Sequence, residues 1–245
     1  AIKQLVALFG EGTEAAKKFA SLALTRLALA NPDNQAQIAK RLVGLLDHDD
    51  SSVVSLAALD LQSLAQDHPG APIVIVNAGA ISPLVSVLSN GKTDEGRQQA
   101  AKTLHTLANS GPANQLAIAI GLVALLGVGS DNAQEYVTEL LLTLTSVKSD
   151  SEADIEAAKL NRRAIANAGP FRMLVMQLRS NSAKVKALAS AVLSQLSGDS
   201  EQNVTEIANV NGISPLVALQ GEGADDTKQN VTAVLADMTR NSRAH

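Results

Sequence analysis

The sequence contains no cysteine and no tryptophan, and aromatic residues make up only 2% of its 245 residues. The absence of cysteine excludes disulfide bonds and thiolate metal sites, and it leaves the redox compartment open. A compact globule of this size normally anchors its core on several large aromatic side chains, which bury more surface than other residue types. Here the apolar residues are mainly alanine, leucine, valine and isoleucine, a composition typical of closely packed helices.

Positive charge and long apolar runs are also scarce. The formal net charge is −4, which argues against a nucleic-acid or anionic-membrane surface because such a surface needs a basic stripe. No apolar stretch approaches the roughly 20 residues of a membrane span. We therefore expect no nucleic-acid partner and no membrane span. No secretory signal is visible, although a leader could have been removed before Ala1. We expect an intracellular, cytoplasmic location.

One phrase of the sequence recurs. Residues 75–85 read Ile-Val-Asn-Ala-Gly-Ala-Ile-Ser-Pro-Leu-Val, and residues 207–217 read Ile-Ala-Asn-Val-Asn-Gly-Ile-Ser-Pro-Leu-Val. A weaker copy runs from Ile165 through Gly169 and Pro170 to Val175. Each copy reads as the end of a short helix, a glycine stop and the start of a second helix. A recurring phrase indicates an array of structural repeats.

The spacing of the array follows from one leucine per repeat. The markers are Leu5, Leu42, Leu84, Leu122, Leu174 and Leu216, with steps of 37, 42, 38, 52 and 42 residues. A period near 40 residues is typical of repeats built from two or three helices.

A second pattern tests whether these leucine markers define the repeats correctly. About 15 residues after each marker comes a small or β-branched residue, followed by apolar residues four and seven positions later and a small residue at the eighth. The spacing i, i+4, i+7, i+8 describes one face of an α-helix, so each repeat is predicted to end in an amphipathic third helix. The starting residues are Ala20, Ala57, Ala100, Val137, Ala189 and Val231.

Glycine pairs recur between the second and third predicted helices. They are Gly10 and Gly12, Gly127 and Gly129, and Gly221 and Gly223. We interpret them as turns that need a positive φ, in preference to a phosphate-binding loop.

The step from Leu122 to Leu174 is about ten residues longer than its neighbours. After Gly111-Pro112 we expect a short helix through Ile118, and the extra length falls in residues 149–167. Serine or aspartate followed by acids is typical of an N-cap, so we predict a lengthened first helix there. It carries Glu156, Lys159, Arg162 and Arg163. These charges suit the helix dipole, or they mark a partner-specific protrusion, because repeat insertions often map to a binding face.

These features together resemble armadillo repeats over nearly the whole chain. The resemblance rests on the breaks at Gly79 and Gly212, the Ile-Ser-Pro-Leu-Val starts and the Ala-x-x-x-Leu-x-x-Leu-Ala third helices. It implies an all-α, right-handed superhelical solenoid of about six three-helix repeats, whose third helices line a concave groove. We expect one solenoid over residues 1–245, as part of a longer chain. The expected repeats are 1–30, 31–66, 67–110, 111–148, 149–198 and 199–245.

In nuclear-import members of the family, a tryptophan two residues after the small marker residue and an asparagine six after it hold an extended peptide in the groove. The first position is here occupied by Leu22, Leu59, Lys102, Glu139, Ala191 and Ala233, and the second by Arg26, Ser63, Thr106, Thr143, Gln195 and Asp237. Neither tryptophan nor asparagine occurs at these positions, so that mode of peptide recognition is not expected.

The candidate partner-binding residues on the groove face are polar or charged. They are Lys18, Arg26, Ser63, Lys102, Thr106, Glu135, Glu139, Lys184 and Gln195. The face is basic near residue 18 and acidic near residue 135, so a partner with an acidic end and a basic segment would suit it. The alternative is that these are ordinary solvated charges. Phe19 and Tyr136 share one repeat position, where we interpret them as packing between third helices, with exposed anchors as the alternative.

No catalytic constellation or cofactor motif is visible, so we predict a protein that is not an enzyme and needs no cofactor. The polar residues 47–50 are read as a solvated loop that caps the next helix, and the four histidines lack metal-ligand spacing. We expect a protein-interaction scaffold or adaptor, a structural subunit of a larger assembly. The alternatives are a transport receptor that binds extended peptide cargo in the groove, and a regulatory or chaperone-like subunit of an enzyme complex.

Overall fold

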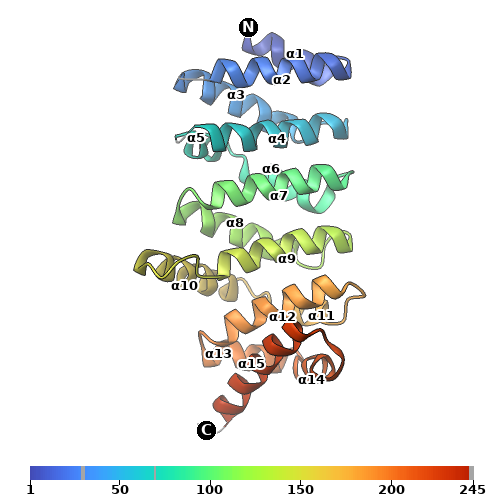
Figure 1. Ribbon diagram of the computed structural model, residues 1–245, viewed down its shortest axis with the longest axis vertical. Coiled ribbons are helices and arrows are strands. Elements are labelled where there is room, and N and C mark those ends of the chain that lie inside the picture. The colour runs from blue at the N-terminus through green and yellow to red at the C-terminus, as the bar shows by residue number, and fades with distance from the viewer. Residues whose placement is uncertain (29–30, 69, 243–245) are drawn as a thin grey trace. The chain divides into compact units, whose positions relative to one another are not determined.

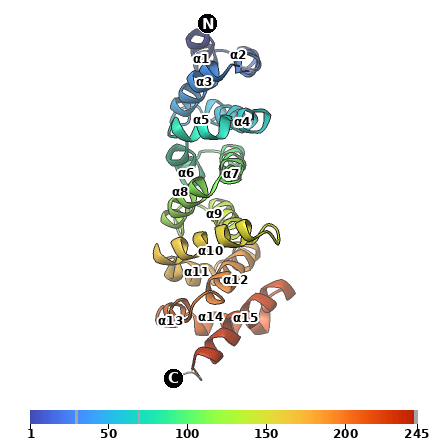
Figure 2. The ribbon, with the colours of Figure 1, turned by 90° about the vertical axis from the view of Figure 1, so that its left-hand side faces the viewer.

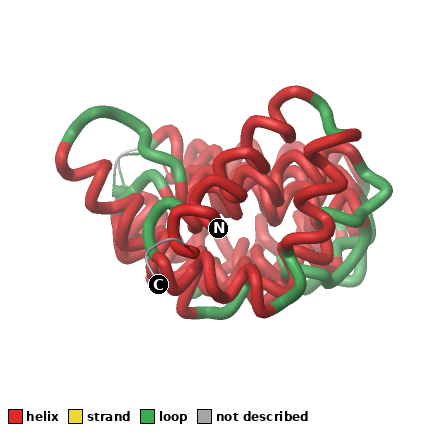
Figure 3. Tube along the Cα trace, turned by 90° about the horizontal axis from the view of Figure 1, so that it is seen from below, coloured by secondary structure: helices red, strands yellow, loops and turns green. Residues whose placement is uncertain are grey.

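The computed structural model describes residues 1–28, 31–68 and 70–242. Within these ranges the chain forms 15 α-helices and no β-strand (Figures 1 and 3). The chain divides into two compact units, an N-terminal unit of residues 1–121 and a C-terminal unit of residues 122–245.

In the N-terminal unit, α2, α4 and α7 lie side by side in one layer, and the remaining helices form a second layer behind them (Figures 1 and 2). Helix α4 packs against both α2 and α7. The helices of this unit are α1 (Ile2–Glu11), α2 (Glu14–Ala28), α3 (Pro32–Leu45), α4 (Ser51–Asp67), α5 (Ala71–Asn77), α6 (Ile81–Asn90) and α7 (Asp94–Ala108), followed by α8 (Pro112–Leu125), which runs across the boundary.

The C-terminal unit repeats this arrangement, with α12 packed between α9 and α15. Its helices are α9 (Asp131–Thr145), α10 (Glu152–Asn167), α11 (Phe171–Gln177), α12 (Ala183–Ser197), α13 (Glu201–Asn209), α14 (Ile213–Glu222) and α15 (Asp225–Ser242). Helices α2, α4, α7, α9, α12 and α15 correspond to the predicted third helices, so we call them the third helices below.

The predicted apolar stripe forms the core of the third helices. In α4, Ala57, Leu61, Leu64 and Ala65 are all buried, and the four equivalent residues of α7, α9 and α12 are buried as well. In α15 only Val231 of the stripe is fully buried, while residues 235 and 238 are half-buried. Burial of this stripe against neighbouring helices is what stabilises a stacked-repeat protein.

Two repeats contain a continuous helix where two separate helices were expected. Helix α3 passes through Leu42 without a break, and α8 continues to Leu125, so the short helix predicted to end at Ile118 is wrong. Neither segment holds the combination of glycine and proline that separates the helices elsewhere. Gly121 lies inside α8 and faces Val85, whose Cγ2 atom would be 3.3 Å from an added Cβ. This glycine therefore serves close packing and does not end the helix.

The predicted glycine stops are confirmed between α5 and α6 and between α10 and α11. Gly79 and Gly169 have φ of +81° and +75°, values that end a helix and that glycine adopts readily. The break before α14 is made differently. Asn211 takes the positive φ of 62°, which asparagine tolerates better than most residues. Gly212 has a φ of −71°, and a Cβ there would lie 2.6 Å from the Ile207 carbonyl oxygen.

The paired glycines divide into three kinds. Gly10 and Gly221 lie inside α1 and α14 and have no positive φ, so the predicted turn is wrong for them. Gly127 and Gly129 have φ of +79° and +87°, as predicted. The prediction of positive φ is wrong for Gly12 and Gly223, whose φ values are −77° and −73°. An added Cβ would lie 2.3 Å from the Leu8 carbonyl oxygen at Gly12. Close backbone approach therefore explains this glycine, and the same holds at position 223.

The lengthened first helix is confirmed. Helix α10 has 16 residues, against 7 in α5 and 9 in α13, the other separate first helices. The Ser151 side chain accepts a hydrogen bond of 3.2 Å from the Asp154 backbone N–H, as the N-cap signature predicts.

Among the described residues, no single helix is long and apolar enough to cross a membrane. Helices α5 and α6 reach that length and composition only as a pair, bent by 78°. Ile75, Leu84 and Leu88 of this pair are fully buried inside the N-terminal unit.

Candidate protein-binding face

Helix α2 presents one exposed stripe that mixes apolar and basic side chains. Lys18, Phe19, Leu22 and Arg26 follow helical spacing and are all exposed. Phe19 is 72% exposed and Leu22 is 50% exposed. Two large apolar side chains exposed next to each other are unusual on a helix of a folded protein. The neighbouring residue Ala20 is buried, so the helix does have a buried face, and Phe19 and Leu22 lie outside it.

Hydrogen bonds between helices determine how this stripe aligns with α4 and α7. The Ser21 hydroxyl on α2 donates to Asp60 Oδ1 on α4 over 2.7 Å. The Thr103 hydroxyl on α7 lies 2.9 Å from the Ala58 carbonyl oxygen on α4 and 2.7 Å from the Gln99 carbonyl oxygen of its own helix, and shares its proton between them. Each bond joins residues adjacent in sequence to one of the exposed side chains.

Leu22, Leu59 and Lys102 therefore occupy equivalent positions on three neighbouring helices. Leu59 is 38% exposed, and Lys102 is exposed. We call the set Lys18, Phe19, Leu22, Arg26, Leu59 and Lys102 the α2–α4–α7 face.

The three cations of this face are available to a partner. Lys18, Arg26 and Lys102 make no ion pair with any residue that the structure describes. Of the other predicted binding residues nearby, Ser63 is half-buried, and Thr106 is half-buried with its hydroxyl donating to the Lys102 carbonyl oxygen over 3.0 Å. The face is therefore basic and apolar.

A buried carboxylate lies beside this row. Asp60 is only 7% exposed, and its Oδ2 atom has no hydrogen-bond partner among the described residues. Burial raises the pKa of Asp60 to about 6, while the hydrogen bond from Ser21 acts in the opposite direction. Sequence reasoning did not single out this residue.

The predicted acidic part of the face, in the C-terminal unit, is compensated internally. Lys184 on α12 lies 3.6 Å from Glu135 and 3.2 Å from Glu139 on α9. The hydrogen bond to Glu139 is the main cause of a raised Lys184 pKa. Glu135 also accepts a hydrogen bond of 2.8 Å from the Ser182 hydroxyl. Gln195, the remaining predicted residue, is exposed.

The two aromatic residues at the shared repeat position differ. Tyr136 is half-buried between its neighbours, whereas Phe19 is exposed. The packing interpretation is therefore wrong for Phe19.

The polar loop at residues 47–50 caps α4, as expected. Asp50 Oδ1 accepts from the Ser52 backbone N–H over 2.9 Å, and Asp50 Oδ2 pairs with the Lys17 ammonium over 2.6 Å. The hydrogen bond from Lys17 holds the pKa of Asp50 well below its usual range. Lys17 is thereby committed to a structural contact. In the described ranges no group of three His, Asp or Glu side chains is placed to hold a metal ion.

No protein-family model matches the sequence. A catenin beta from Urechis caupo is 24% identical over 248 residues, which covers 97% of this chain and 29% of the catenin. An engineered protein of known structure superposes with a TM-score of 0.66 at 24% identity, over 98% of this chain and 97% of the other. A designed armadillo repeat protein in complex with the peptide (KR)4 superposes with a TM-score of 0.65 at 18% identity, over 97% and 99% of the two chains.

The chain has the armadillo-repeat fold. At these sequence identities, the structural similarity shows only that the fold is shared. The chain spans about 29% of the length of the catenin that it matches. Within the armadillo fold, Leu22, Leu59 and Lys102 are the residues two positions after the small marker of each third helix.

Proposed function

We propose that the chain is a non-catalytic protein-interaction scaffold that binds an extended, acidic and apolar segment of a partner on the α2–α4–α7 face. The observation that carries this proposal is the composition of that face. Three exposed large apolar side chains lie among three cations that lack an internal partner, on helices whose alignment is fixed by hydrogen bonds.

The physical argument concerns both affinity and orientation. Fully burying a leucine or phenylalanine side chain contributes about 1.5–3 kcal/mol, so Phe19, Leu22 and Leu59 would supply most of the favourable energy. Lys18, Arg26 and Lys102 would attract acidic side chains and set the direction of the segment. The rigid helices that carry these residues lose little conformational freedom on binding.

The similar designed protein with the peptide (KR)4 is in complex with a basic peptide. The cations of the α2–α4–α7 face favour the opposite charge. The proposed partner segment is thus acidic, and we propose that this armadillo protein acts as an adaptor or structural subunit within a larger assembly.

Selection from a displayed library of random 12-residue peptides against the intact chain tests the proposal. We expect the enriched peptides to combine Asp or Glu with large apolar residues. Affinity, measured by fluorescence anisotropy, should fall by about 100-fold in the double variant Leu22→Ser/Leu59→Ser, because two anchors are lost.

The C-terminal unit offers a matched control. Ile213 and Val217 are two exposed apolar residues of α14, at 51% and 55% exposure. The variant Ile213→Ser/Val217→Ser should bind the enriched peptides as the parent does. Enrichment of basic peptides, or equal affinity loss in both double variants, would contradict the proposal.

A further inference from the structure

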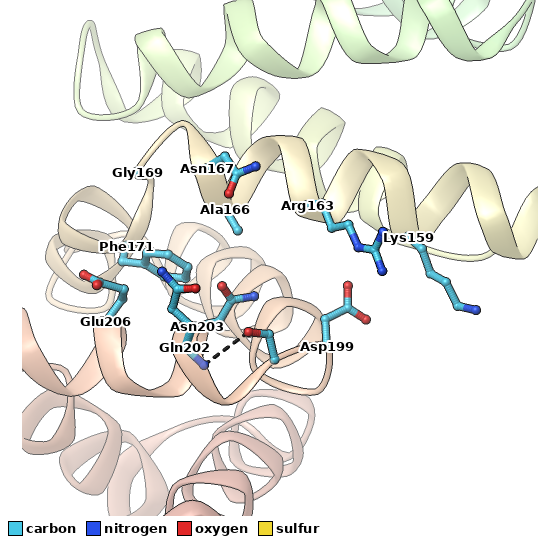
Figure 4. Close-up of a pocket in the computed structure, with 11 residues that line it drawn as sticks. Lys159, Arg163, Ala166, Asn167, Gly169, Phe171, Asp199, Gln202, Asn203 and Glu206 are labelled. Atoms are coloured by element: carbon cyan, nitrogen blue, oxygen red, sulfur yellow. Dashed lines mark hydrogen bonds between the residues drawn. The ribbon is translucent and has the colours of Figure 1, made fainter.

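A large cleft lies between α10 and α13 in the C-terminal unit (Figure 4). Its volume is about 720 Å³, whereas two other clefts measure about 170 and 200 Å³. Phe171, which is 5% exposed, forms part of its lining at the start of α11. This volume lies within the range of about 300–1,000 Å³ that ligand sites occupy.

The wall supplied by α10 is held firmly in place. The Arg162 side chain is buried, with Nε donating to Asp199 Oδ2 over 2.6 Å and a terminal N–H donating to the Thr145 carbonyl oxygen over 2.7 Å. The Asn161 side chain donates to the Leu144 carbonyl oxygen over 3.0 Å. These bonds tie α10 to the end of α9 and to the residue before the α13 N-cap, so both walls of the cleft are preorganised.

The outer side of the same helix bears two cations. Lys159 and Arg163 are one helical turn apart and line the cleft beside Asp199 (Figure 4). Lys159 pairs with Glu156 over 2.8 Å, whereas Arg163 is exposed and makes no hydrogen bond or ion pair of its own within the described residues. Asp199 already pairs with Arg162. This end of the cleft therefore has an uncompensated positive charge.

Amide side chains from both helices occupy the middle of the cleft. Asn167 comes from α10, and Gln202 and Asn203 come from α13 (Figure 4). The Asn203 Nδ2 group donates to the Leu196 carbonyl oxygen over 2.8 Å, which fixes the orientation of its side chain. Amide groups offer both donors and acceptors, as a peptide backbone does. Beyond them, the carboxylate of Glu206 lies near Phe171.

We propose that the α10–α13 cleft is a second binding site, which takes a short extended segment of a partner protein with an acidic side chain at the Lys159–Arg163 end. The acidic side chain pairs with Arg163, and Asn167, Gln202 and Asn203 bond to the peptide backbone. A small anion such as phosphate would use only the cationic end and would leave the three amides unused. The cleft is formed by first helices of the repeats, so this site is separate from the third-helix face proposed above.

The test uses the full chain carrying Leu22→Ser/Leu59→Ser, which should weaken binding by the α2–α4–α7 face about 100-fold. A displayed library of random nine-residue peptides is selected against this protein, and the affinity of the enriched peptides is measured by fluorescence anisotropy. We expect the enriched peptides to share an Asp or Glu. The further double change Lys159→Glu/Arg163→Glu should weaken their binding by about tenfold or more, since charge-assisted bonds are replaced by repulsion.

Arg179→Glu on the same background is the control, because Arg179 is an exposed cation of the same unit that does not line the cleft. It should leave the affinity within about twofold of the background protein. Replacing the shared acid of the peptide by its amide should weaken binding as much as the cleft variant does.

Three outcomes would overturn the proposal. The first is a failure to enrich any peptide. The second is enrichment of peptides whose binding is unchanged in the cleft variant Lys159→Glu/Arg163→Glu. The third is protection of the cleft from hydrogen exchange by 10 mM inorganic phosphate but by none of the enriched peptides. Loss of this site leaves binding by the α2–α4–α7 face intact in the parent chain, so the two proposals fail separately.

Discussion

In the N-terminal unit the exposed cations of α2 and α7 have no acidic partner among the described residues, whereas in the C-terminal unit Lys184 bridges Glu135 and Glu139. Glu135 and Glu139 occupy the repeat positions of Lys18 and Lys102, whereas Lys184 lies at a different position, five residues before the marker Ala189. The difference shows that equivalent positions can serve different purposes within one fold. According to the proposed function, one face keeps its charges for a partner, whereas the other uses them to link neighbouring helices.

The contacts between third helices are of similar kinds in the two units. In the N-terminal unit they include the hydrogen bonds Ser21–Asp60 and Thr103–Ala58. In the C-terminal unit, Ser197 donates to Asp237 over 2.8 Å, and the Arg162–Asp199 ion pair anchors α10. The N-terminal unit also has the Lys17–Asp50 ion pair between α2 and the start of α4. Both units therefore use charged groups in contacts between helices, and substitutions can test how much each contact stabilises.

The largest effect is expected from Arg162→Met. The change leaves the Thr145 carbonyl oxygen without its donor and removes the ion pair with Asp199, whose side chain is 24% exposed, at a cost of about 3 kcal/mol for the two interactions. Hydrogen exchange should locate the lost protection in α10, α12 and α13. The adjacent exposed Arg163→Met should change the free energy of unfolding by less than about 0.5 kcal/mol. Equal effects of the two changes would show that the buried pair does not stabilise the unit.

The second prediction concerns Asp60 in the N-terminal unit. Its pKa is about 6 in the folded chain, against 3.8 for an unperturbed aspartate, so the folded state binds more protons than the unfolded state between these values. The free energy of unfolding should therefore fall by about 2–3 kcal/mol as the pH rises from 4 to 6, and stay low above pH 6.

Asp60→Asn should remove this dependence. It should stabilise the chain at pH 7.5 by only about 1 kcal/mol, because the gain from removing a buried charge is partly offset by new amide N–H groups that also lack partners. Urea unfolding at pH 4.5 and 7.5 provides the measurement. The exposed Asp67→Asn on the same helix is the control. A destabilised Asp60→Asn variant at pH 7.5 would mean that the carboxylate is paired in solution.

Thr103→Val should cost about 1 kcal/mol, because it removes the buried hydroxyl shared between the Ala58 and Gln99 carbonyl oxygens without changing the shape of the side chain. In the C-terminal unit Thr138 is equally buried, and its hydroxyl donates to Gln177 over 3.2 Å. Thr138→Val should have a similar cost, measured by urea unfolding. A negligible cost at residue 103 would show that its hydrogen bond does not hold α7 to α4.

The smallest predicted difference compares two surface lysines of third helices, one with acidic partners and one without. Lys184→Gln should lower the free energy of unfolding by about 0.5 kcal/mol, and less at 1 M salt, because exposed ion pairs are weak and screened. Lys18→Gln should have no effect at either salt concentration. If both changes cost the same, the charges of the two units are not used differently.

Much of the fold could be predicted from the sequence, because the i, i+4, i+7, i+8 stripe reports directly which face of each third helix is buried. The N-cap of α10 was predictable for the same reason, since a serine followed by acids acts locally. The fusion of first and second helices in α3 and α8 was harder to predict. Whether a helix continues past a residue such as Gly121 depends on what packs against it.

The site was predictable only in part. The cations were found because a helical wheel places Lys18, Arg26 and Lys102 on one face. Phe19 was assigned to packing, since apolar residues are usually interior, and only the structure shows that nothing covers it. Pairing of Lys184 with two glutamates and the burial of Asp60 depend on how neighbouring helices align, which a single helix pattern does not encode.

The central claim is that a partner segment contacts the third helices of the N-terminal unit and not those of the C-terminal unit. A photo-crosslinking amino acid placed at residue 59, or at the equivalent residue 191 of α12, tests it directly with an enriched acidic peptide. We predict efficient cross-linking from residue 59 and only background from residue 191, with competition by unlabelled peptide. Equal cross-linking from both positions, or cross-linking from residue 191 alone, would contradict the account.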